Sequence, residues 1–387
     1  MPPAPPTTAP QKPAPGLFNP AGTARYMRAS PLFKIGPAAP APALRRGFLL
    51  AVPVGLALAF EFGFDAPTKG AIATGASLAG FAAMDAPAGP RAAWQAAAAP
   101  AIGIAAALGV LSSQVAPLAV LAMGLTGALA GYCFAYSFRL AIFGLSTALG
   151  LMVAQGFFLP VSDAPLALLW GTCGGLAQAA WSLLVWLTYE RRARGPSGWD
   201  AAAAKTAFRQ NLTLKSDSFR HAIRFGAALA AGVATYRVFE MENHGFWIPL
   251  TILFVMRADR DETYLRIVLR AAGTAAGLIV ATALAETVGS ETAVVVALLF
   301  VAAALAYGLL TVQYALFTAS ITIFVVLMVD ALGEPALDAA GLRAIGTAIG
   351  LAICLLAWLI WPKPRQGRGL DFGALRVPAP APERRAR

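Results

Sequence analysis

Residues 291–309 read ETAVVVALLFVAAALAYGL, and residues 312–330 read VQYALFTASITIFVVLMVD. Each run comes close to the roughly 20 residues that an α-helix needs to cross a bilayer, because a helix rises 1.5 Å per residue. Both runs are continuously apolar, whereas the strands of a membrane barrel alternate apolar and polar residues. The two runs therefore predict a pair of adjacent transmembrane helices.

The composition of the whole chain agrees with this prediction. Hydrophobic residues make up 58% of the 387 residues and charged residues 13%, whereas soluble domains have about 45–50% and about 25%. A soluble fold could not bury so many apolar side chains, so lipid must cover much of the surface. The basic residues that give the chain its net charge of +11 lie between the apolar runs and at the two ends. This placement indicates membrane topology and not a nucleic-acid surface.

Similar apolar runs recur along the chain and predict an all-α polytopic membrane protein with about twelve transmembrane helices. We expect them at 44–61, 69–85, 92–111, 114–132, 137–158, 164–189, 221–239, 246–257, 265–286, 291–309, 312–330 and 341–361. The run that begins at Phe246 is short for a membrane span. This pattern divides the chain into a disordered Pro/Ala-rich tail (1–42), a first six-helix repeat (43–189), a basic linker (190–219), a second six-helix repeat (220–362) and a basic tail (363–387).

The charges of the connecting segments predict the orientation in the membrane. Basic residues dominate the N-terminal tail, the segments around Arg91 and Arg139, the linker, the turn from Arg257 to Arg266 and the C-terminal tail. Acidic residues dominate the alternate segments, where Lys69, Arg237 and Arg343 are exceptions. Since Lys and Arg accumulate on the cytoplasmic side, we expect both termini to be cytoplasmic in a multi-pass protein of a bacterial inner membrane.

A weak internal repeat supports the division into halves. The string Gly171-Thr172-Cys173-Gly174-Gly175-Leu176-Ala177 recurs as Gly346-Thr347-Ala348-Ile349-Gly350-Leu351-Ala352, and Leu151-Met152-Val153 recurs as Leu327-Met328-Val329. The spacing of about 175 residues is nearly constant, which indicates a duplication. Six helices per copy give both copies the same orientation, so we predict parallel tandem repeats with a cavity or pathway between them.

The second half also carries a family motif. Phe246-Trp247-Ile248-Pro249-Leu250-Thr251 precedes an apolar segment that ends at Arg257, and Arg270-Ala271-Ala272-Gly273-Thr274-Ala275-Ala276-Gly277 follows. This arrangement resembles the fusaric acid resistance family over residues 219–362, and the first half resembles it more weakly. Aromatic acid exporters belong to that family, and plant malate channels are similar at a distance. Many members carry large soluble domains, whereas this chain has about 30 residues between its halves, so we expect a compact form.

Five residues are candidates for substrate binding or gating. They are Arg270, Arg257, Asp259, Trp247 and His244. Arg270 is expected about one turn into its helix, where it would bind a carboxylate, pair with Asp259 or Asp261, or extend to the headgroups. Asp259 belongs to a mixed-charge turn that would form a structural ion-pair cluster or a gate. Trp247 is expected in an interfacial belt or against an aromatic ligand, and His244 is either solvated or sensitive to pH.

The small residues of the repeated strings have a simpler interpretation. Small side chains four residues apart let transmembrane helices pack closely, and we expect this role for Gly171, Thr172, Gly175, Gly273, Thr274, Gly277, Gly346, Thr347 and Gly350. Cys133, Cys173 and Cys354 lack the spacing of metal ligands, and two histidines are too few for a histidine-based metal site. We therefore expect no metal and no cofactor.

Sequence motifs for catalysis are lacking, so the sequence does not predict an enzyme. The resemblance and the basic inner face instead predict efflux of small organic anions, aromatic carboxylates in particular, driven by the proton gradient. A passive organic-anion channel and a non-transporting membrane scaffold are the alternatives. The expected partners are the organic anion, the lipid bilayer, and a second copy of the chain or a periplasmic adaptor, with no nucleic acid.

Overall fold

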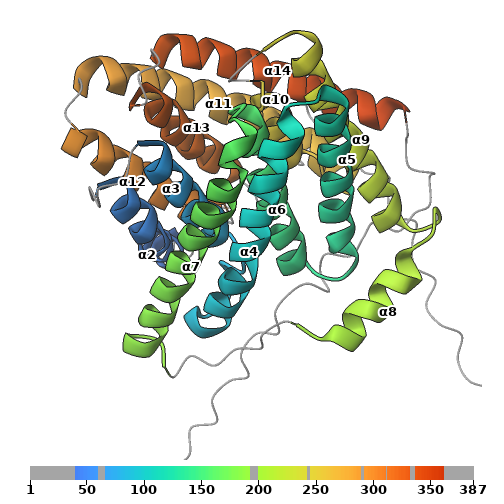
Figure 1. Cartoon of the computed structure of the whole chain (residues 1–387), viewed down its shortest axis with the longest axis horizontal. Helices are drawn as coiled ribbons and strands as arrows, with labels where there is room; N and C mark the ends of the chain where they lie inside the picture. The colour runs from blue at the N-terminus through green and yellow to red at the C-terminus, as the bar shows by residue number, and fades with distance from the viewer. Residues whose placement is uncertain are drawn as a thin grey trace, which may run out of the picture.

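The computed structural model describes residues 40–59, 66–191, 199–241, 245–288, 292–310, 312–331 and 336–360. In this part of the chain the structure contains thirteen α-helices and no β-strand. Six of the helices precede the linker helix α8 and six follow it (Figure 1). The helices of the first half are α2 (Pro40–Ala59), α3 (Ala66–Gly80), α4 (Ala88–Ser113), α5 (Ala116–Tyr132), α6 (Phe138–Gly156) and α7 (Ala164–Thr188).

The helices of the second half match the remaining predicted segments. They are α9 (Asp217–Val238), α10 (Trp247–Val255), α11 (Arg260–Val288), α12 (Thr292–Leu309), α13 (Tyr314–Ala331) and α14 (Ala336–Ile360). Each of the twelve predicted segments therefore contains one helix. The fold class is confirmed as an all-α membrane protein with many apolar helices.

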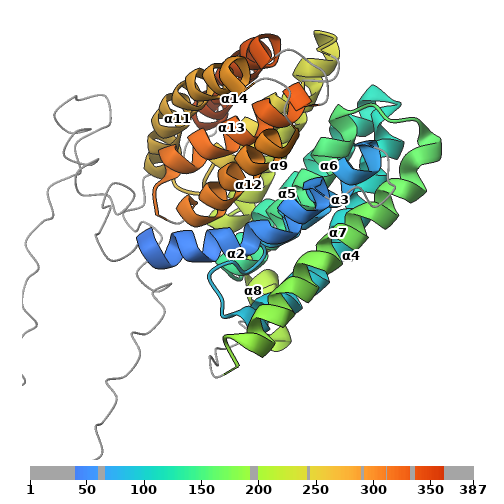
Figure 2. The ribbon, with the colours of Figure 1, turned by 90° about the vertical axis from the view of Figure 1, so that its left-hand side faces the viewer.

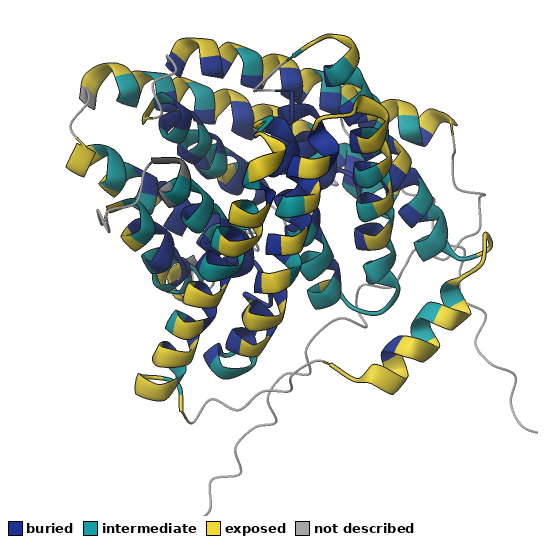
Figure 3. Ribbon diagram, in the orientation of Figure 1, coloured by how far each residue is buried: buried dark blue, intermediate teal, exposed yellow. Residues whose placement is uncertain are grey.

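Nine of the described helices are long and apolar enough to cross a membrane. The other four described helices do not reach that standard: α3, α8 and α10 have 15, 11 and 9 residues, and α9 carries Asp217, Arg220, Arg224 and Arg237. The protein therefore spans the membrane many times, and the exact number of twelve crossings stays a prediction. Exposed leucine and isoleucine side chains, such as Leu129 and Ile360, form the outward faces of the bundle, where lipid is their natural solvent (Figure 3).

The two halves pack on each other through reciprocal helix pairs. The first helix of the first half, α2, packs against α12, and the first helix of the second half, α9, packs against α5. Figure 2 shows α2 running along α12 and α9 lying beside α5. The pairs inside each half also correspond, since α4 contacts α6 and α7 just as α11 contacts α13 and α14. These matching pairs are consistent with a duplicated six-helix unit, and the duplication itself stays a prediction.

Glycines form the close contacts of both reciprocal pairs. A Cβ atom on Gly47 of α2 would collide with the carbonyl oxygen of Ala304 on α12, and one on Gly226 of α9 would lie 2.5 Å from the carbonyl oxygen of Gly124 on α5. The two contacts are related by an offset of about 180 residues. Because no side chain other than hydrogen fits there, these glycines bring the helix backbones together in the way that lipid-embedded bundles require.

Helix α8 (Ala201–Asn211) is not predicted by the sequence, because the polar segment 190–219 has the composition of a linker. The Asp200 carboxylate caps the start of α8 by accepting hydrogen bonds from the backbone N–H groups of Ala202 and Ala203, at 2.9 and 3.0 Å. Two tyrosines, at the end of α5 and shortly after it, hold α8 in place. The Tyr132 hydroxyl donates to the carbonyl oxygen of Phe208, and the Tyr136 hydroxyl accepts from the backbone N–H of Asp200 at 2.8 Å.

Helix α10 is short and enclosed by protein. Nine residues rise about 13 Å, which is less than half of the roughly 30 Å hydrocarbon core. Every residue of α10 except Phe254 is buried, as expected for a helix that is apolar on all sides. Pro249 lies in its first turn, where a missing N–H costs little. The helix therefore ends inside the bundle and presents its side chains to neighbouring helices.

Candidate anion-binding site

Two arginines face the two aromatic side chains of α10. The Arg343 guanidinium carbon on α14 lies 5.4 Å from the ring centroid of Trp247, and the Arg270 guanidinium carbon on α11 lies 5.6 Å from that of Phe254. Trp247 and Phe254 are seven residues apart, which places them on one face of α10 at a separation of about 10 Å. The arrangement therefore forms two successive cation–aromatic pairs along one short helix.

Both arginines lie deep inside the second half. Arg270 and Arg343 are fully buried, with 0% of each exposed. Because α11 begins at Arg260, Arg270 lies about 15 Å along the helix, near the middle of a membrane span. The expectation that Arg270 lies one turn into its helix was therefore wrong. Its buried side chain cannot extend to the headgroups in this structure, as a snorkelling arginine would.

Neither arginine has a counter-ion among the residues that the structure describes. None of their guanidinium nitrogens has a hydrogen-bond partner there, and no described carboxylate lies within ion-pair distance of either. The Tyr314 hydroxyl oxygen faces Arg270 as a polar neighbour, but this hydroxyl is neutral and donates its hydrogen to the carbonyl oxygen of Phe254 at 3.0 Å, so it supplies no counter-charge. A buried charge without a partner is costly, and an anion that binds between the two arginines would remove that cost.

Buried threonine hydroxyls lie on the helices that carry the arginines and on the neighbouring α13. Thr274 follows Arg270 by one helical turn, and Thr347 follows Arg343 by one turn, so each pair shares a helix face. The hydroxyls of both threonines are buried and lack hydrogen-bond partners in the described residues. The same holds for two threonines of the neighbouring α13, Thr318 and Thr322. The region thus offers neutral hydrogen-bond donors beside the two positive charges.

Glycines place these groups close together. A Cβ atom on Gly273 or Gly277 of α11 would lie 2.8 Å from the Cβ atom of a threonine on α13. On α14, a Cβ atom on Gly346 would lie 3.0 Å from the Trp247 Cβ, and one on Gly350 would lie 2.7 Å from the Thr251 Cβ. The small residues predicted for packing therefore bring α10, α11, α13 and α14 into contact around the arginines.

The corresponding small residues of the first half join α3, α4 and α7. A Cβ atom on Gly75 would collide with the carbonyl oxygen of Gly171, and one on Gly103 would collide with the Thr172 hydroxyl. Gly175 lies against Ala99 of α4, whose Cβ atom would be 2.6 Å from an added one. These three positions therefore also lie at close helix contacts.

The predicted mixed-charge turn forms a separate cluster at the start of α11. The Arg266 Nε donates to Glu262 Oε1 at 3.0 Å, and the Arg257 Nε lies 3.7 Å from the same oxygen. Asp259 caps α11 by accepting from the backbone N–H of Glu262 at 3.0 Å. Neither Asp259 nor Asp261 pairs with Arg270, so that alternative for Arg270 was wrong. The Arg266 guanidinium carbon lies 4.5 Å from the Tyr314 ring centroid, which links this cluster to the site.

Three residues of the site were not predicted, namely Arg343, Phe254 and Tyr314. Arg343 lies at the start of the predicted helix 341–361, where it is an exception to the charge pattern of the outer segments, and that exception is the available signal. Trp247 and Arg270 were predicted and lie in the site, although their role in binding stays a prediction. Arg257 and Asp259 lie in the mixed-charge cluster, and His244 falls outside the described residues.

By the spacing of about 175 residues between the repeated strings, Arg270 of the second half corresponds to a neutral residue of the first half. Gln95 on α4 precedes Arg270 by about 175 residues, the spacing of the internal repeat. Gln95 is also fully buried, and neither atom of its amide has a hydrogen-bond partner in the described part of the chain. At this pair of corresponding positions, the second half therefore has a buried arginine without a counter-ion among the described residues, and the first half has a neutral glutamine.

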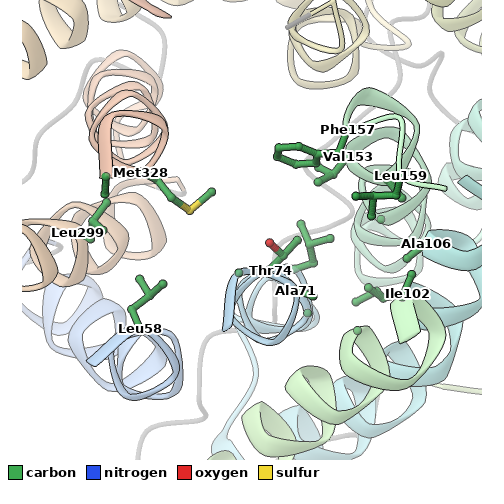
Figure 4. A pocket seen from close by; sticks show the side chains of 18 of the residues that line it. Leu58, Ala71, Thr74, Ile102, Ala106, Val153, Phe157, Leu159, Leu299 and Met328 are labelled. Carbon is green, nitrogen blue, oxygen red and sulfur yellow. The ribbon is translucent and has the colours of Figure 1, made fainter. Parts of the chain in front are cut away.

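A cavity of about 650 Å³ lies between the two halves (Figure 4). Helices α3, α4, α6 and α7 form one side of it, and α2, α12 and α13 form the other. Neither Arg270 nor Arg343 lines this cavity. The protein therefore has a closed polar site within its second half and a separate apolar cavity between the halves.

Comparisons with known proteins agree with the motif. Residues 228–357 match the family model described as fusaric acid resistance protein-like. The Inner membrane protein YccS of Escherichia coli (strain K12) is 36% identical over 157 residues, which cover 40% of this chain and 21% of that protein. The uncharacterized protein ORF2 of Neisseria gonorrhoeae is 32% identical over 163 residues, which cover 40% of this chain and 37% of that protein.

A further relative is an uncharacterized protein of Haemophilus influenzae that is 29% identical over 153 residues. The matches span 21% to 37% of the lengths of these three relatives. No solved structure matches the chain. The matched region contains α10, α11 and both buried arginines. It confirms the predicted resemblance: residues 228–357 of this integral membrane protein are similar to the fusaric acid resistance protein-like family.

Proposed function

We propose that the protein is a bacterial inner-membrane transporter that exports small organic anions, with aromatic carboxylates as its main substrates. The observation that carries this proposal is the pair of fully buried, unpaired arginines beside Trp247 and Phe254. A carboxylate forms charge-assisted hydrogen bonds with guanidinium groups. An aromatic ring attached to that carboxylate would stack on the aromatic side chains of α10.

The direction and location of transport follow from more general features. The relative in Escherichia coli is described as an inner membrane protein, and the charge pattern predicts that the Arg257–Arg266 cluster faces the cytoplasm. A basic entrance raises the local concentration of anions, so the cytoplasmic side is the side of loading. Export of an anion against its gradient requires an energy source, for which the proton gradient is our candidate.

The burial of the site favours a transporter over a channel. A channel needs a continuously open path, whereas both arginines are fully enclosed in this structure. Helix movement must open the site to each side in turn, as in carriers built from repeated bundles. The cavity between the halves argues against a scaffold without transport, which would require no such space.

Flux measurements in proteoliposomes test the proposal. We would load vesicles with labelled benzoate, hydroxybenzoates and benzenesulfonate, impose a pH gradient, and follow release. Benzenesulfonate stays charged, so its release cannot come from passive diffusion of a protonated acid. We expect release through the wild-type protein. For Arg270→Met and Arg343→Met we expect a rate about tenfold to a hundredfold lower, because each variant loses a charged hydrogen bond of about 1.5–3 kcal/mol.

Arg139→Met serves as the matched control, since Arg139 pairs with Asp85 at 3.0 Å outside the site. It should transport at the wild-type rate. Arg270→Lys and Arg343→Lys keep the charge and should retain part of the activity. Release that equals protein-free vesicles for every anion would refute transport. Anion currents across a planar bilayer that contains the protein, if they persist without a pH gradient, would instead identify the channel alternative.

A further inference from the structure

The cavity between the halves is almost entirely apolar. Leu58, Ala71, Val153, Leu299 and Met328 project into it from five different helices (Figure 4). Its volume of about 650 Å³ lies within the range of about 300–1,000 Å³ of sites that enclose a small molecule. A Cβ atom added to Gly70, which lines the cavity, would meet no atom within 4 Å. The cavity is therefore large enough to hold a ligand, and its walls favour an apolar one.

One acidic side chain, Asp330, lines this cavity among the residues that the structure describes. The other polar side chains of its lining are Thr74 and Thr292. Asp330 Oδ1 accepts a hydrogen bond from the backbone N–H of Ala336 at 3.1 Å. No lysine or arginine whose side chain the structure describes forms an ion pair with Asp330. The cavity thus has a negative charge at one point of an apolar lining.

We propose that this cavity binds a single-chain amphiphile whose polar end is a positively charged ammonium group. The apolar body would lie against Leu299, Val153 and Met328, and the ammonium would lie against Asp330. Opposite charges attract more strongly beside an apolar wall than in water. The same carboxylate repels a carboxylate or a phosphate, so the cavity excludes both the anions of the arginine site and the phosphate of a membrane phospholipid.

This second site does not depend on the proposed transport of anions. The arginine site is positively charged and closed, whereas the cavity is apolar and has a negative residue in its lining. The two sites are formed by different residues and bind ligands of opposite charge. An ammonium amphiphile would bind where several helices of both halves meet, and it would therefore also affect how the halves move relative to each other.

Binding of dodecyltrimethylammonium tests the proposal. We would place the full-length protein in phosphatidylcholine nanodiscs, add the radiolabelled amphiphile, and subtract its partition into empty discs. We expect one saturable site per chain. Unlabelled dodecyltrimethylammonium should compete for it, and dodecanoate, which has a negative end group, should compete at least tenfold less well.

Two variants and two matched controls locate the site. Gly70→Phe fills open space in the cavity and should abolish saturable binding. Asp330→Asn should weaken binding of dodecyltrimethylammonium about tenfold and should bring dodecanoate to a similar affinity. The amide oxygen of the asparagine keeps the hydrogen bond from the backbone N–H of Ala336. Gly341→Phe also enters open space, but outside the cavity. Asp338→Asn removes an exposed charge of α14, and both controls should bind as the wild type does.

Two results would overturn the proposal. Saturable binding that survives in Gly70→Phe would place the amphiphile elsewhere. Equal competition by dodecanoate and dodecyltrimethylammonium in the wild type, unchanged in Asp330→Asn, would show that the cavity holds hydrocarbon without selecting its end group. Absence of any saturable component in the wild type would refute the site altogether.

Discussion

Replacing Arg343 with methionine removes a positive charge from the interior of the second half while keeping a long, unbranched side chain. In most proteins the loss of a buried arginine destabilises the fold, because its partner carboxylate is left without a counter-ion. Arg343 has no such partner among the described residues. We therefore expect the opposite sign, namely that Arg343→Met stabilises the ligand-free protein.

The magnitude follows from the cost of arginine in a membrane span. An arginine near the centre of a transmembrane helix costs about 2.5–3.5 kcal/mol on insertion scales, whereas an apolar residue there contributes about −0.5 kcal/mol. Arg343 lies seven residues from the start of α14, so the lower end of this range applies. The variant loses the contact between Arg343 and Trp247 at 5.4 Å, which is worth about 0.5–2 kcal/mol. The net gain in unfolding free energy is about 2 kcal/mol, and for a chain of 387 residues the midpoint of thermal unfolding should rise by about 2–3 °C.

Thermal unfolding in detergent micelles, followed by circular dichroism at 222 nm, measures this change without relying on tryptophan emission. Arg266→Met is the control, because Arg266 donates to Glu262 at 3.0 Å. It should unfold at a lower temperature than the wild type. An aromatic carboxylate at 100 times its dissociation constant should stabilise the wild type by about 2.7 kcal/mol and should leave Arg343→Met nearly unchanged.

A lower unfolding temperature for Arg343→Met would refute the reasoning. It would show that a group of the protein itself stabilises the Arg343 charge, so that the site is a structural ion pair and not an empty anion site. Stabilisation of Arg343→Met by the carboxylate to the same extent as the wild type would refute the assignment of Arg343 to binding, even if the stability change had the expected sign.

Two further substitutions test the packing around the site and between the halves. Gly226→Ala places a Cβ atom 2.5 Å from the carbonyl oxygen of Gly124. The overpacking cost of about 1–3 kcal/mol should exceed the gain in helix propensity of about 1 kcal/mol, so the midpoint of thermal unfolding should fall. Gly341→Ala is the control, because its Cβ atom enters open space, and it should raise the midpoint. Tyr314→Phe removes the hydrogen bond to the carbonyl oxygen of Phe254, so the unfolding free energy should fall by about 1 kcal/mol. An unchanged unfolding free energy would show that this hydrogen bond does not hold α13 against α10.

Much of the fold was predictable because lipid imposes a simple pattern on sequence. Helices that cross a bilayer must be long and apolar, and each of the twelve predicted segments contains one helix. Helix α8 was missed for the complementary reason. The segment 190–219 is polar, and the local signals for a helix there, a run of alanines after the N-capping Asp200, are weak beside the absence of an apolar face.

The depth of Arg270 was mispredicted because the apolar run does not mark the true start of α11. The helix begins at Arg260, five residues before the predicted start, and Asp261 and Glu262 lie in its first turn. Acidic residues at a helix N-terminus are favourable, so a helix can extend through charged residues that hydropathy treats as a loop. The cavity between the halves could not be predicted either, since seven helices contribute to it.

The first half provides an internal comparison for the buried arginine of α11. Helices α4 and α11 make matching contacts in their respective halves, and Gln95 occupies the position that precedes Arg270 by about 175 residues. A fully buried neutral side chain is therefore compatible with this packing. If the fold does not require a charge at the position, the cost of burying Arg270 without a partner must be offset in another state of the protein. Binding of an anion is the state that offsets it most directly, because it supplies the missing counter-charge where the structure provides none.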